Sequence, residues 1–244
     1  MARRAWCTAS AEPLVASEPL VSVIVPVLQE RAAIGRTLDH LQALRGRFEV
    51  IVVDGGSTDG TLDAARAHAV GARLVRSGRG RGHQMNAGAR IARGEVLLFL
   101  HADTRLPMTA YRSLVRAVRA GAAGGNFDLR FDGGGAFAAT LGVVYRLQRM
   151  VRVFYGDSAI WVTRRAFARL GGYPEIPIME DLQLARALMA TRCTVKLPGP
   201  AITSSRRWHQ AGITRTVVLW VLIRYLYFLG VAPDRLARLY RVVR

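Results

Sequence analysis

Apolar runs that alternate with helical segments dominate the first hundred residues of this chain. Val21–Val27 and residues 48–53 are nearly continuous runs of valine, isoleucine and other apolar residues. Between them, residues 30–44 place isoleucine or leucine at positions 34, 38, 41 and 44, which is the spacing of a buried helix face. Strands without polar alternation are typical of parallel sheets that helices cover on both faces. The pattern therefore predicts a doubly wound α/β fold.

The alternation of strand and helix continues as far as residue 103. A Gly/Ser/Thr turn leads into residues 58–68, which are compatible with a helix. The next expected elements are a strand at 72–76, a helix at 84–92 and a strand at 95–100. Ligands of such sheets bind beyond the carboxyl ends of the strands. Residues 21–104 are therefore expected to form a nucleotide-binding half.

The pattern after residue 120 is looser but remains mixed. Strands are expected at Gly124–Phe131 and 159–162, and helices at 136–150 and from residue 180 to about 190. No low-complexity linker interrupts the chain. We therefore expect residues 105–210 to form the acceptor half of the same domain.

The two ends of the chain differ from the middle in composition. Residues 1–20 contain two arginines followed by polar residues and prolines, which does not match a signal peptide and indicates a loosely ordered leader. Residues 211–244 are apolar and basic and are expected to form a C-terminal helix. Their apolar part, 217–231, is shorter than the ~20 residues of a spanning helix. It fits a peripheral contact with an anionic membrane and a homodimer contact equally.

Charge and cysteine content restrict the compartment and the partners. The formal net charge is +18, and Lys196 is the only lysine. Arginine, alanine and glycine dominate, which indicates compositional drift, with attraction to phosphates and acidic lipids as a by-product. Cys7 and Cys193 belong to no metal-spaced cluster, so neither a disulfide framework nor a zinc site is predicted. We expect a cytoplasmic protein, either free or at the inner face of the cell membrane, with no specific nucleic-acid partner.

Polar residues gather at or just after the ends of the predicted strands. They are Gln29, Glu30, Asp54, Ser57, Asp59, His101 and Asp103. Acceptors such as Asp54 and Glu30 suit the base and ribose of a nucleotide. A bound diphosphate needs a cation, and Mg²⁺ or Mn²⁺ requires only one or two protein carboxylates when substrate oxygens complete its shell. Asp103 is the predicted ligand, and His101 is either a second ligand, suited to Mn²⁺, or a residue that only hydrogen-bonds the loop.

Two further groups fit the remaining parts of such a reaction. Arg79 and Arg81 alternate with glycines in residues 77–82, so the backbone can approach an anion while guanidinium groups donate to it. A solvated turn is the competing explanation. Glu180 and Asp181 open a predicted helix, where carboxylates also serve as N-terminal caps. We favour Asp181 as the general base for an acceptor hydroxyl.

Together these segments resemble the inverting family 2 glycosyltransferases of the GT-A fold. The resemblance rests on residues 23–30, on the Asp-Gly-Gly-Ser-Thr-Asp-Gly turn at 54–60, on 100–104 and on Met-Glu-Asp at 179–181. It extends from about residue 21 to residue 208. It implies a small, non-processive enzyme that uses Mn²⁺ or Mg²⁺ to move a hexose from a nucleoside diphosphate sugar to an acceptor hydroxyl, which is soluble or lipid-linked.

The resemblance also implies roles for individual residues. Asp54 would contact the base, Asp103 and His101 would bind the metal, and Asp181 with Glu180 would serve catalysis. The nucleotide-binding set is Pro26, Glu30, Asp54, Gly56, Ser57, Arg79, Arg81, Asn86 and Ala102. Arg206, Arg207 and Trp208 echo a Gln-x-x-Arg-Trp signature and would contact the acceptor or the phosphates.

Three features depart from the family pattern. His101-Ala102-Asp103 stands where Asp-x-Asp is common, which leaves the choice between Mn²⁺ and Mg²⁺ open. Met85, rather than an arginine, precedes Asn86, so Arg79 or Arg81 takes the phosphate role. The long membrane spans of processive synthases are missing from this sequence.

Two other functions share parts of this pattern. A sugar nucleotidyltransferase has similar strands and helices, but such enzymes usually place a Gly-rich loop after the first strand, where this chain has Val27-Leu28-Gln29-Glu30. A non-catalytic binder of polyanions or acidic lipid would explain the arginines. It would not explain the carboxylates at the strand ends, because these repel phosphates unless a cation intervenes.

Overall fold

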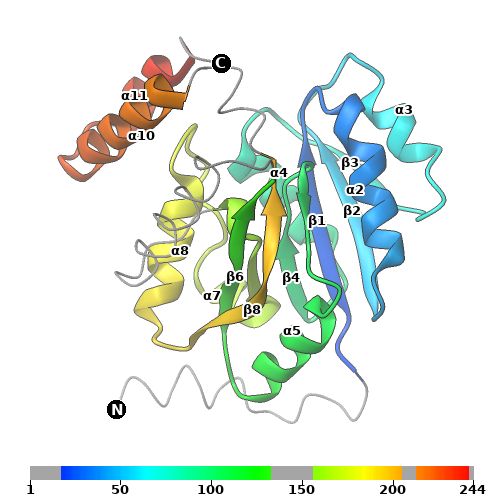
Figure 1. The fold of residues 1–244 in the computed structure, drawn as a ribbon. Helices are drawn as coiled ribbons and strands as arrows, with labels where there is room; N and C mark the ends of the chain where they lie inside the picture. The colour runs from blue at the N-terminus through cyan, green and yellow to red at the C-terminus, as the bar shows by residue number, and fades with distance from the viewer. Residues whose placement is uncertain (1–17, 133–155, 205–212, 242–244) are drawn as a thin grey trace.

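The first apolar run, Val21–Val27, forms strand β1 of a sheet in the computed structural model, which describes residues 18–132, 156–204 and 213–241 (Figure 1). Strand β1 pairs in parallel with β2 (Phe48–Asp54) and with β4 (Val96–Phe99). Strand β3 (Arg73–Arg76) extends this parallel group beside β2. The predicted doubly wound, mostly parallel arrangement is confirmed for this part of the chain.

The other half of the sheet is mixed. Strand β7 (Ile160–Thr163) runs antiparallel to β4 and to β6 (Gly124–Phe131). Strand β8 (Thr194–Thr203) pairs in parallel with β6, and the short β5 (Thr104–Arg105) lies antiparallel to β8. The order within the described residues is β3-β2-β1-β4-β7-β6-β8-β5. The sequence predicted β6 and β7 as strands, but an apolar run does not specify the direction of its partners.

Helices cover both faces of the sheet. Helices α2 (Arg31–Ala43) and α5 (Ala110–Arg119) pack on one face, where Val23 and Val25 are fully buried with them. Helices α4 (Arg81–Ile91), α7 (Arg164–Arg169) and α8 (Glu180–Ala190) pack on the other face, where Ile24 is buried. Successive residues of one strand therefore enter opposite cores, which requires the nearly continuous apolar runs.

Two helices differ from their expected bounds. Helix α3 spans only Thr61–Arg66 rather than 58–68, because Gly60 is left-handed, with φ of +83°, and residues 58–60 form a turn. Helix α4 begins at Arg81 rather than 84, directly after Gly80. Gly88 lets α4 approach the sheet, since a Cβ there would lie 2.5 Å from Cγ2 of Ile24. The predicted helix at 136–150 and most of the predicted leader lie outside the described residues.

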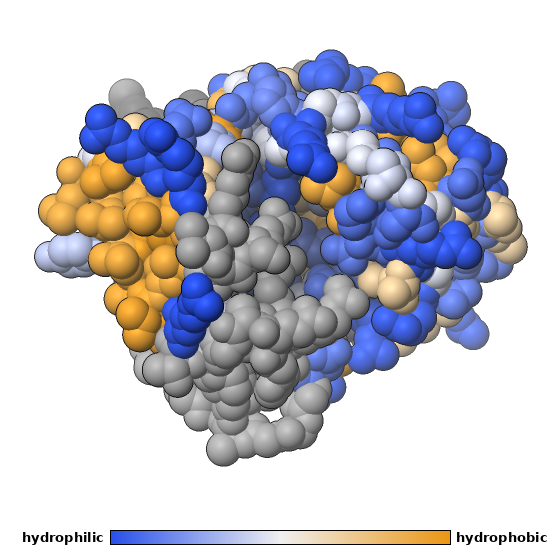
Figure 2. Space-filling view, turned by 90° about the horizontal axis from the view of Figure 1, so that it is seen from above, coloured by the Kyte–Doolittle hydropathy of each residue, from blue (hydrophilic) through white to orange (hydrophobic). Residues whose placement is uncertain are grey.

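The apolar C-terminal segment forms a helical hairpin. Helix α10 (Ile213–Phe228) contains most of the 217–231 segment, and α11 (Pro233–Arg241) follows it (Figure 1). The hairpin packs against residues 178–182, with Ile223 and Leu236 fully buried. Figure 2 shows hydrophobic surface gathered over this part of the molecule. In the part of the chain that the structure describes, no helix has the length and apolarity to cross a membrane.

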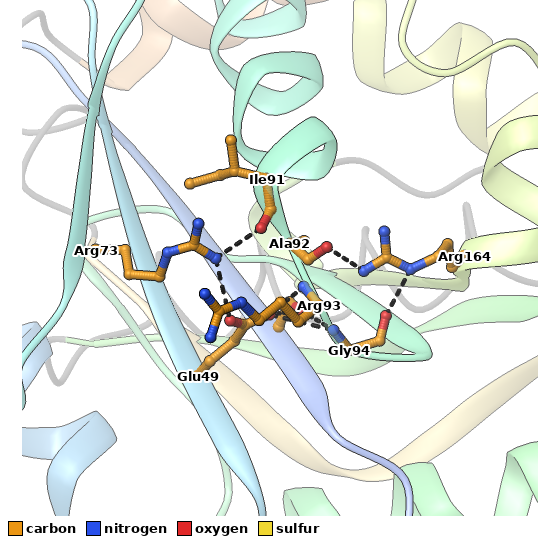
Figure 3. A network of polar contacts seen from close by, with 8 residues as sticks. Glu49, Arg73, Ile91, Ala92, Arg93, Gly94 and Arg164 are labelled. Carbon is orange, nitrogen blue, oxygen red and sulfur yellow. Dashed lines mark hydrogen bonds and ion pairs between the residues drawn. The ribbon is translucent and has the colours of Figure 1, made fainter.

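A polar network fixes the loop between α4 and β4 at the amino ends of the parallel strands (Figure 3). Glu49 accepts hydrogen bonds from the amides of Arg93 at 2.5 Å and Gly94 at 3.2 Å, and Arg73 lies 3.6 Å away. Burial opposes ionisation of Glu49, but these donors and the Ser22 hydroxyl outweigh it and lower its pKa. Arg164 donates to the carbonyl of Gly94 at 2.9 Å. The network stabilises the amino ends of the parallel strands, whereas the predicted site residues lie at the carboxyl ends.

Candidate active site

A cleft opens at the carboxyl ends of β1 and β4. The end of β1 and the segment after it contribute residues 26–28 and Glu30, and the start of α4 contributes Arg81 and Gln84. The loop after β4 contributes His101, Ala102 and Asp103, and the start of α8 contributes Glu180 and Asp181. The two carboxylates that the sequence assigned to metal binding and to proton transfer, Asp103 and Asp181, therefore line the same cleft.

The turn after β2 is organised by its own carboxylate. Asp54 is 1% exposed and accepts hydrogen bonds from the amides of Gly56 at 3.2 Å and Ser57 at 3.0 Å. The Ser57 hydroxyl in turn accepts the amide of Gln29 at 3.0 Å. Asp54, Gly56 and Ser57 thus form the turn at the carboxyl end of β2 but are not among the described residues that line the cleft, and their contact with a nucleotide base stays a prediction.

Asp59 and Thr61 join the same turn to the start of α2. Asp59 accepts the amide of Arg31 at 3.1 Å, and the Thr61 hydroxyl accepts the amide of Glu30 at 2.9 Å. Gln29 adopts a left-handed backbone, with φ of +57°, at the point where the chain leaves β1. These contacts hold Glu30 at the mouth of the cleft, next to Pro26.

The two candidate arginines have different positions. Arg81 lines the cleft, and its guanidinium lies 4.0 Å from Glu180 Oε1, the outer limit of an ion pair. Arg79 is exposed on the preceding loop and is not among the described residues that line this cleft. Burial alone would lower the pKa of Arg81, but Glu180, Asp157 and Asp181 outweigh it and raise the pKa. Arg81 is therefore the better placed cation for a phosphate.

Asn86 has a structural contact rather than a position on the cleft. Its amide nitrogen donates to the carbonyl of Tyr173 at 2.9 Å, and its amide oxygen accepts the amide of Tyr173 at 2.9 Å. Gln84, which the sequence did not single out, lies in the cleft and donates to the carbonyls of Val27 and Val53, both at 2.8 Å. Gln84 thus ties the carboxyl ends of β1 and β2 together.

The loop after β4 presents Asp103 to the cleft. Its carboxylate forms no hydrogen bond or ion pair with any residue that the structure describes. Ala102 is buried, and its carbonyl accepts a hydrogen bond from the Thr37 hydroxyl, which fixes the loop. His101 Nδ1 lies 3.0 Å from Asp157 Oδ1. A proton shared in this pair leaves Nε2 as the nitrogen that can accept a hydrogen bond or bind a metal.

The described residues contain no cluster of three or more acidic, histidine or cysteine side chains that would hold a metal by themselves. Asp103, with His101 beside it, nevertheless fits a divalent cation that arrives with a diphosphate. Mg²⁺ and Mn²⁺ keep waters and substrate oxygens in their shells and need one or two protein ligands. The donor set thus suits a cation shared with substrate and does not suit a permanently held structural metal.

The start of α8 carries the two acidic residues predicted for catalysis. Met179, the residue before the helix, has a left-handed backbone with φ of +69°. Asp181 Oδ2 accepts the amide of Gly156 at 2.8 Å, and Oδ1 accepts the amide of Leu182 at 2.7 Å. A Cβ on Gly156 would lie 3.0 Å from His101 Nε2 and 3.3 Å from Asp181 Oδ2. Because glycine has no Cβ, His101 from the loop after β4 and Asp181 from the start of α8 can both lie close to residue 156.

Glu180 is buried, with 5% of its surface exposed. Burial, reinforced by the neighbouring charge of Asp181 and partly offset by Arg81, raises the pKa of Glu180 to about 7. A carboxyl group with this pKa changes its protonation state near neutral pH. Glu180 therefore makes the charge of the cleft dependent on pH.

We predict that Glu180→Gln changes the pH dependence of stability. Because the pKa of Glu180 is raised from 4.5 to about 7, its protonated form stabilises the folded state fully below pH 4.5, and this contribution is lost as pH rises through 7. Relative to the variant, wild type should lose on the order of 3 kcal/mol of unfolding free energy across this window. Urea denaturation in EDTA-containing buffers measures the difference. Parallel pH profiles for the two proteins would contradict the assignment.

Asp157, which pairs with the cleft residue His101, was not predicted from the sequence, and neither were Trp220 and Tyr240, which line the cleft. Asp157 lies in the 3-10 helix η1 (Gly156–Ser158), just before β7, where a Gly-Asp-Ser turn at a strand boundary was the available signal. Trp220 from α10 and Tyr240 from α11 also line the cleft, with ring centroids 5.4 Å apart. No local motif distinguishes these aromatic residues from ordinary helix-packing residues. Arg206, Arg207 and Trp208 lie outside the described residues.

Comparison with known proteins gives a family match over most of the sheet. The model described as Glycosyl transferase family 2 matches residues 22–169. A PGL/p-HBAD biosynthesis glycosyltransferase of Mycobacterium tuberculosis is 42% identical over 94 residues, which are 36% of this chain and 37% of the relative. An undecaprenyl-phosphate 4-deoxy-4-formamido-L-arabinose transferase of Aeromonas hydrophila is 33% identical over 112 residues, which are 42% and 34% of the two chains. The chain thus spans about a third of the length of these curated relatives.

Solved structures share the architecture. A mannosyltransferase from Pyrobaculum calidifontis, in complex with GDP-Man and Mn²⁺, superposes with a TM-score of 0.57 at 24% sequence identity. The superposition covers 86% of this chain and 68% of the mannosyltransferase. This similarity shows a shared GT-A fold and confirms the predicted fold class.

Proposed function

The chain belongs to glycosyl transferase family 2, and from this membership we propose that it transfers a hexose from a nucleoside diphosphate sugar to an acceptor hydroxyl, with inversion at the anomeric carbon. The observation that carries the proposal is the presence of Asp103 and Asp181 in one cleft at the carboxyl ends of the strands. One carboxylate is free to bind a cation, and the other is held at the start of a helix across the cleft. Direct displacement needs both groups on opposite sides of one reacting carbon.

The donor would occupy the side of the cleft formed by β1 and α4. Glu30, which lines the cleft, and the nearby Asp54 turn would contact the base and ribose, and an Mn²⁺ or Mg²⁺ ion held by Asp103, with His101 beside it, would neutralise the diphosphate. Arg81 adds a fixed positive charge at the start of α4, where backbone amides also favour an anion. These groups would stabilise the negative charge that develops on the leaving diphosphate.

The acceptor would enter from the side of α8. Asp181 would take the proton of the acceptor hydroxyl as its oxygen attacks the anomeric carbon, while the bond from that carbon to the phosphate oxygen breaks. The hydrogen bonds from the amides of Gly156 and Leu182 hold the Asp181 carboxylate in place. Trp220 and Tyr240 would border the acceptor, because they line the cleft from α10 and α11. An apolar border of this kind suits a lipid-linked acceptor, the class of molecule named in the Aeromonas relative.

A thermal-shift screen of UDP-, GDP-, CDP- and dTDP-sugars with and without Mn²⁺ tests the function. A ligand at one hundred times its Kd stabilises a protein by about 2.7 kcal/mol. For a domain of this size we therefore expect a rise in Tm of roughly 5–10 °C for the cognate donor with metal. The protein should hydrolyse this donor slowly, and it should transfer the sugar when an acceptor is supplied.

Three outcomes would contradict sugar transfer. Stabilisation by a nucleoside triphosphate with release of pyrophosphate would instead indicate a nucleotidyltransferase. Binding of nucleic acid that falls steeply with salt, without nucleotide-sugar turnover, would indicate a polyanion binder. If no nucleotide sugar raised the Tm in a metal-dependent way, the proposed donor would not bind to this protein.

A further inference from the structure

Helix α10 is apolar on both of its sides. Its inner side, with Leu219, Ile223 and Tyr227, packs against α11 and residues 178–182. Its outer side exposes Val218, Val221, Leu222, Tyr225 and Phe228, and Leu229 directly after the helix continues this side, each residue with between 46% and 67% of its surface exposed. These six residues, here called the hairpin patch, follow the helical period, so they form one continuous face. A soluble helix normally places polar residues on its outer side.

The surroundings of the hairpin patch are basic. Arg215 and Arg224 lie on α10, and Arg235 and Arg238 lie on α11, against one acidic residue, Asp234, in the described part of the hairpin. Arg186 from α8 places its guanidinium 5.4 Å from the ring centroid of Phe228. Figure 2 shows the hydrophobic surface with hydrophilic side chains at its margin. An apolar face bordered by arginines matches the chemistry of a lipid surface with anionic headgroups.

We propose that the hairpin patch docks into the interfacial layer of an anionic lipid bilayer, with α10 lying in the membrane plane. The apolar side chains enter the boundary between headgroups and acyl chains, while the arginines contact the headgroup phosphates. This orientation agrees with the 16-residue length of α10 in the described part of the chain, which is short for a membrane span. It also places the protein on a membrane surface, where the inner face of the cell membrane is the anionic leaflet.

A second copy of the chain is a poorer partner for this surface. A twofold dimer through the hairpin would bring the same patch together with itself, so the arginines of each copy would face each other. The described residues of the hairpin hold Arg215, Arg224, Arg235 and Arg238 and one aspartate, so positive charge would exceed negative charge at such a contact. Like charges that approach at an interface oppose association, whereas anionic headgroups neutralise them.

Docking has a consequence for the acceptor, and this consequence rests on the proposed function. Trp220 lies on α10, the helix that carries the patch, and Tyr240 lies on α11, which packs against it, yet both residues line the cleft. The mouth of the cleft therefore lies within one helix diameter, roughly 10–12 Å, of the docked face. A lipid-linked acceptor held in the bilayer would present its polar end at this mouth without leaving the membrane.

Vesicle flotation with the purified full-length chain tests the docking without any nucleotide sugar. Wild type should float with vesicles of phosphatidylcholine and phosphatidylglycerol and should bind phosphatidylcholine vesicles more weakly. The double variant Val221→Glu/Tyr225→Glu should lose at least tenfold in partitioning, because two charges enter the apolar face. Met108→Glu is the matched control, since Met108 is 57% exposed but lies before α5, away from the hairpin.

The arginines are tested separately. Arg235→Gln/Arg238→Gln should lower partitioning to anionic vesicles by roughly fivefold per arginine removed and leave binding to neutral vesicles unchanged. The proposal would be overturned if wild type did not bind anionic vesicles, or if Met108→Glu lost binding as fully as Val221→Glu/Tyr225→Glu. A wild-type dimer, measured by light scattering, that becomes a monomer in Val221→Glu/Tyr225→Glu would also overturn it. Donor hydrolysis in detergent-free buffer reports on the cleft independently, so failure of docking and failure of sugar transfer are distinguishable.

Discussion

Asp181→Asn should lower the rate of sugar transfer by roughly 10²–10⁴-fold, the range for loss of a general base, while donor binding is retained. The asparagine oxygen can still accept one of the two amides that Asp181 accepts, such as that of Gly156, and Leu182 remains packed in the core, so the start of α8 should keep its conformation. The amide cannot take a proton from the acceptor. The loss should therefore appear in kcat, and the Tm shift produced by the donor and Mn²⁺ should remain.

Asp63→Asn is the matched control for this change. Asp63 also lies in the first turn of a helix, but its side chain is 77% exposed on α3, where it pairs with Arg66. Its removal should leave transfer and donor binding at wild-type values. Transfer at the wild-type rate in Asp181→Asn would remove the base assignment, and loss of donor binding in that variant would move the residue to the donor side of the cleft.

Asp103→Ala should abolish the Mn²⁺-dependent part of donor binding. The carboxylate is exposed to the cleft and has no partner among the described residues, so its loss should cost little stability in the absence of ligand. A metal ion contributes several kcal/mol to stabilising charge on a transferring phosphate. We expect turnover to fall on the order of 10³-fold, which corresponds to about 4 kcal/mol.

Metal binding can be read without activity. Electron paramagnetic resonance of Mn²⁺ titrated into protein and nucleoside diphosphate should show a bound ion in wild type and free aqueous ion in Asp103→Ala. Asp63→Ala is the control, since Asp63 is an exposed aspartate on α3 that pairs with Arg66 and lies away from the described lining of the cleft. Equal Mn²⁺ binding by wild type and Asp103→Ala would show that the ion has other ligands.

Local sequence patterns were sufficient for the first half of the fold. The apolar runs at β1, β2 and β4 and the period of α2 follow from side chains that enter two cores in alternation, and this requirement is visible residue by residue. The same patterns located the strand ends and therefore most of the cleft. They also predicted the start of α8 at Glu180, because an acidic pair commonly opens a helix.

Other assignments needed the tertiary structure. Arg79 and Arg81 were equivalent in sequence, and only the start of α4 at residue 81 separates an exposed arginine from one in the cleft. Asn86 and Gln84 lie on the same helix, yet Asn86 holds the backbone of Tyr173 and Gln84 faces the cleft. The two side chains point in different directions around α4, and the packing of α4 on the sheet decides which direction leads to the cleft.

The sequence alone determined most of the strands and helices up to residue 100, because backbone preference and the burial of successive side chains act over a few neighbouring residues, whereas α5, α7 and β8 were not predicted. Tertiary structure alone decided that Asp103 and Asp181 line one cleft, that Asp157 pairs with His101, and that Trp220 and Tyr240 line the same cleft. These residues are distant in the chain, and they come together because β7 pairs antiparallel with β4 and the C-terminal hairpin packs on residues 178–182. Such pairings follow from the burial of whole surfaces, and no short stretch of sequence contains that information.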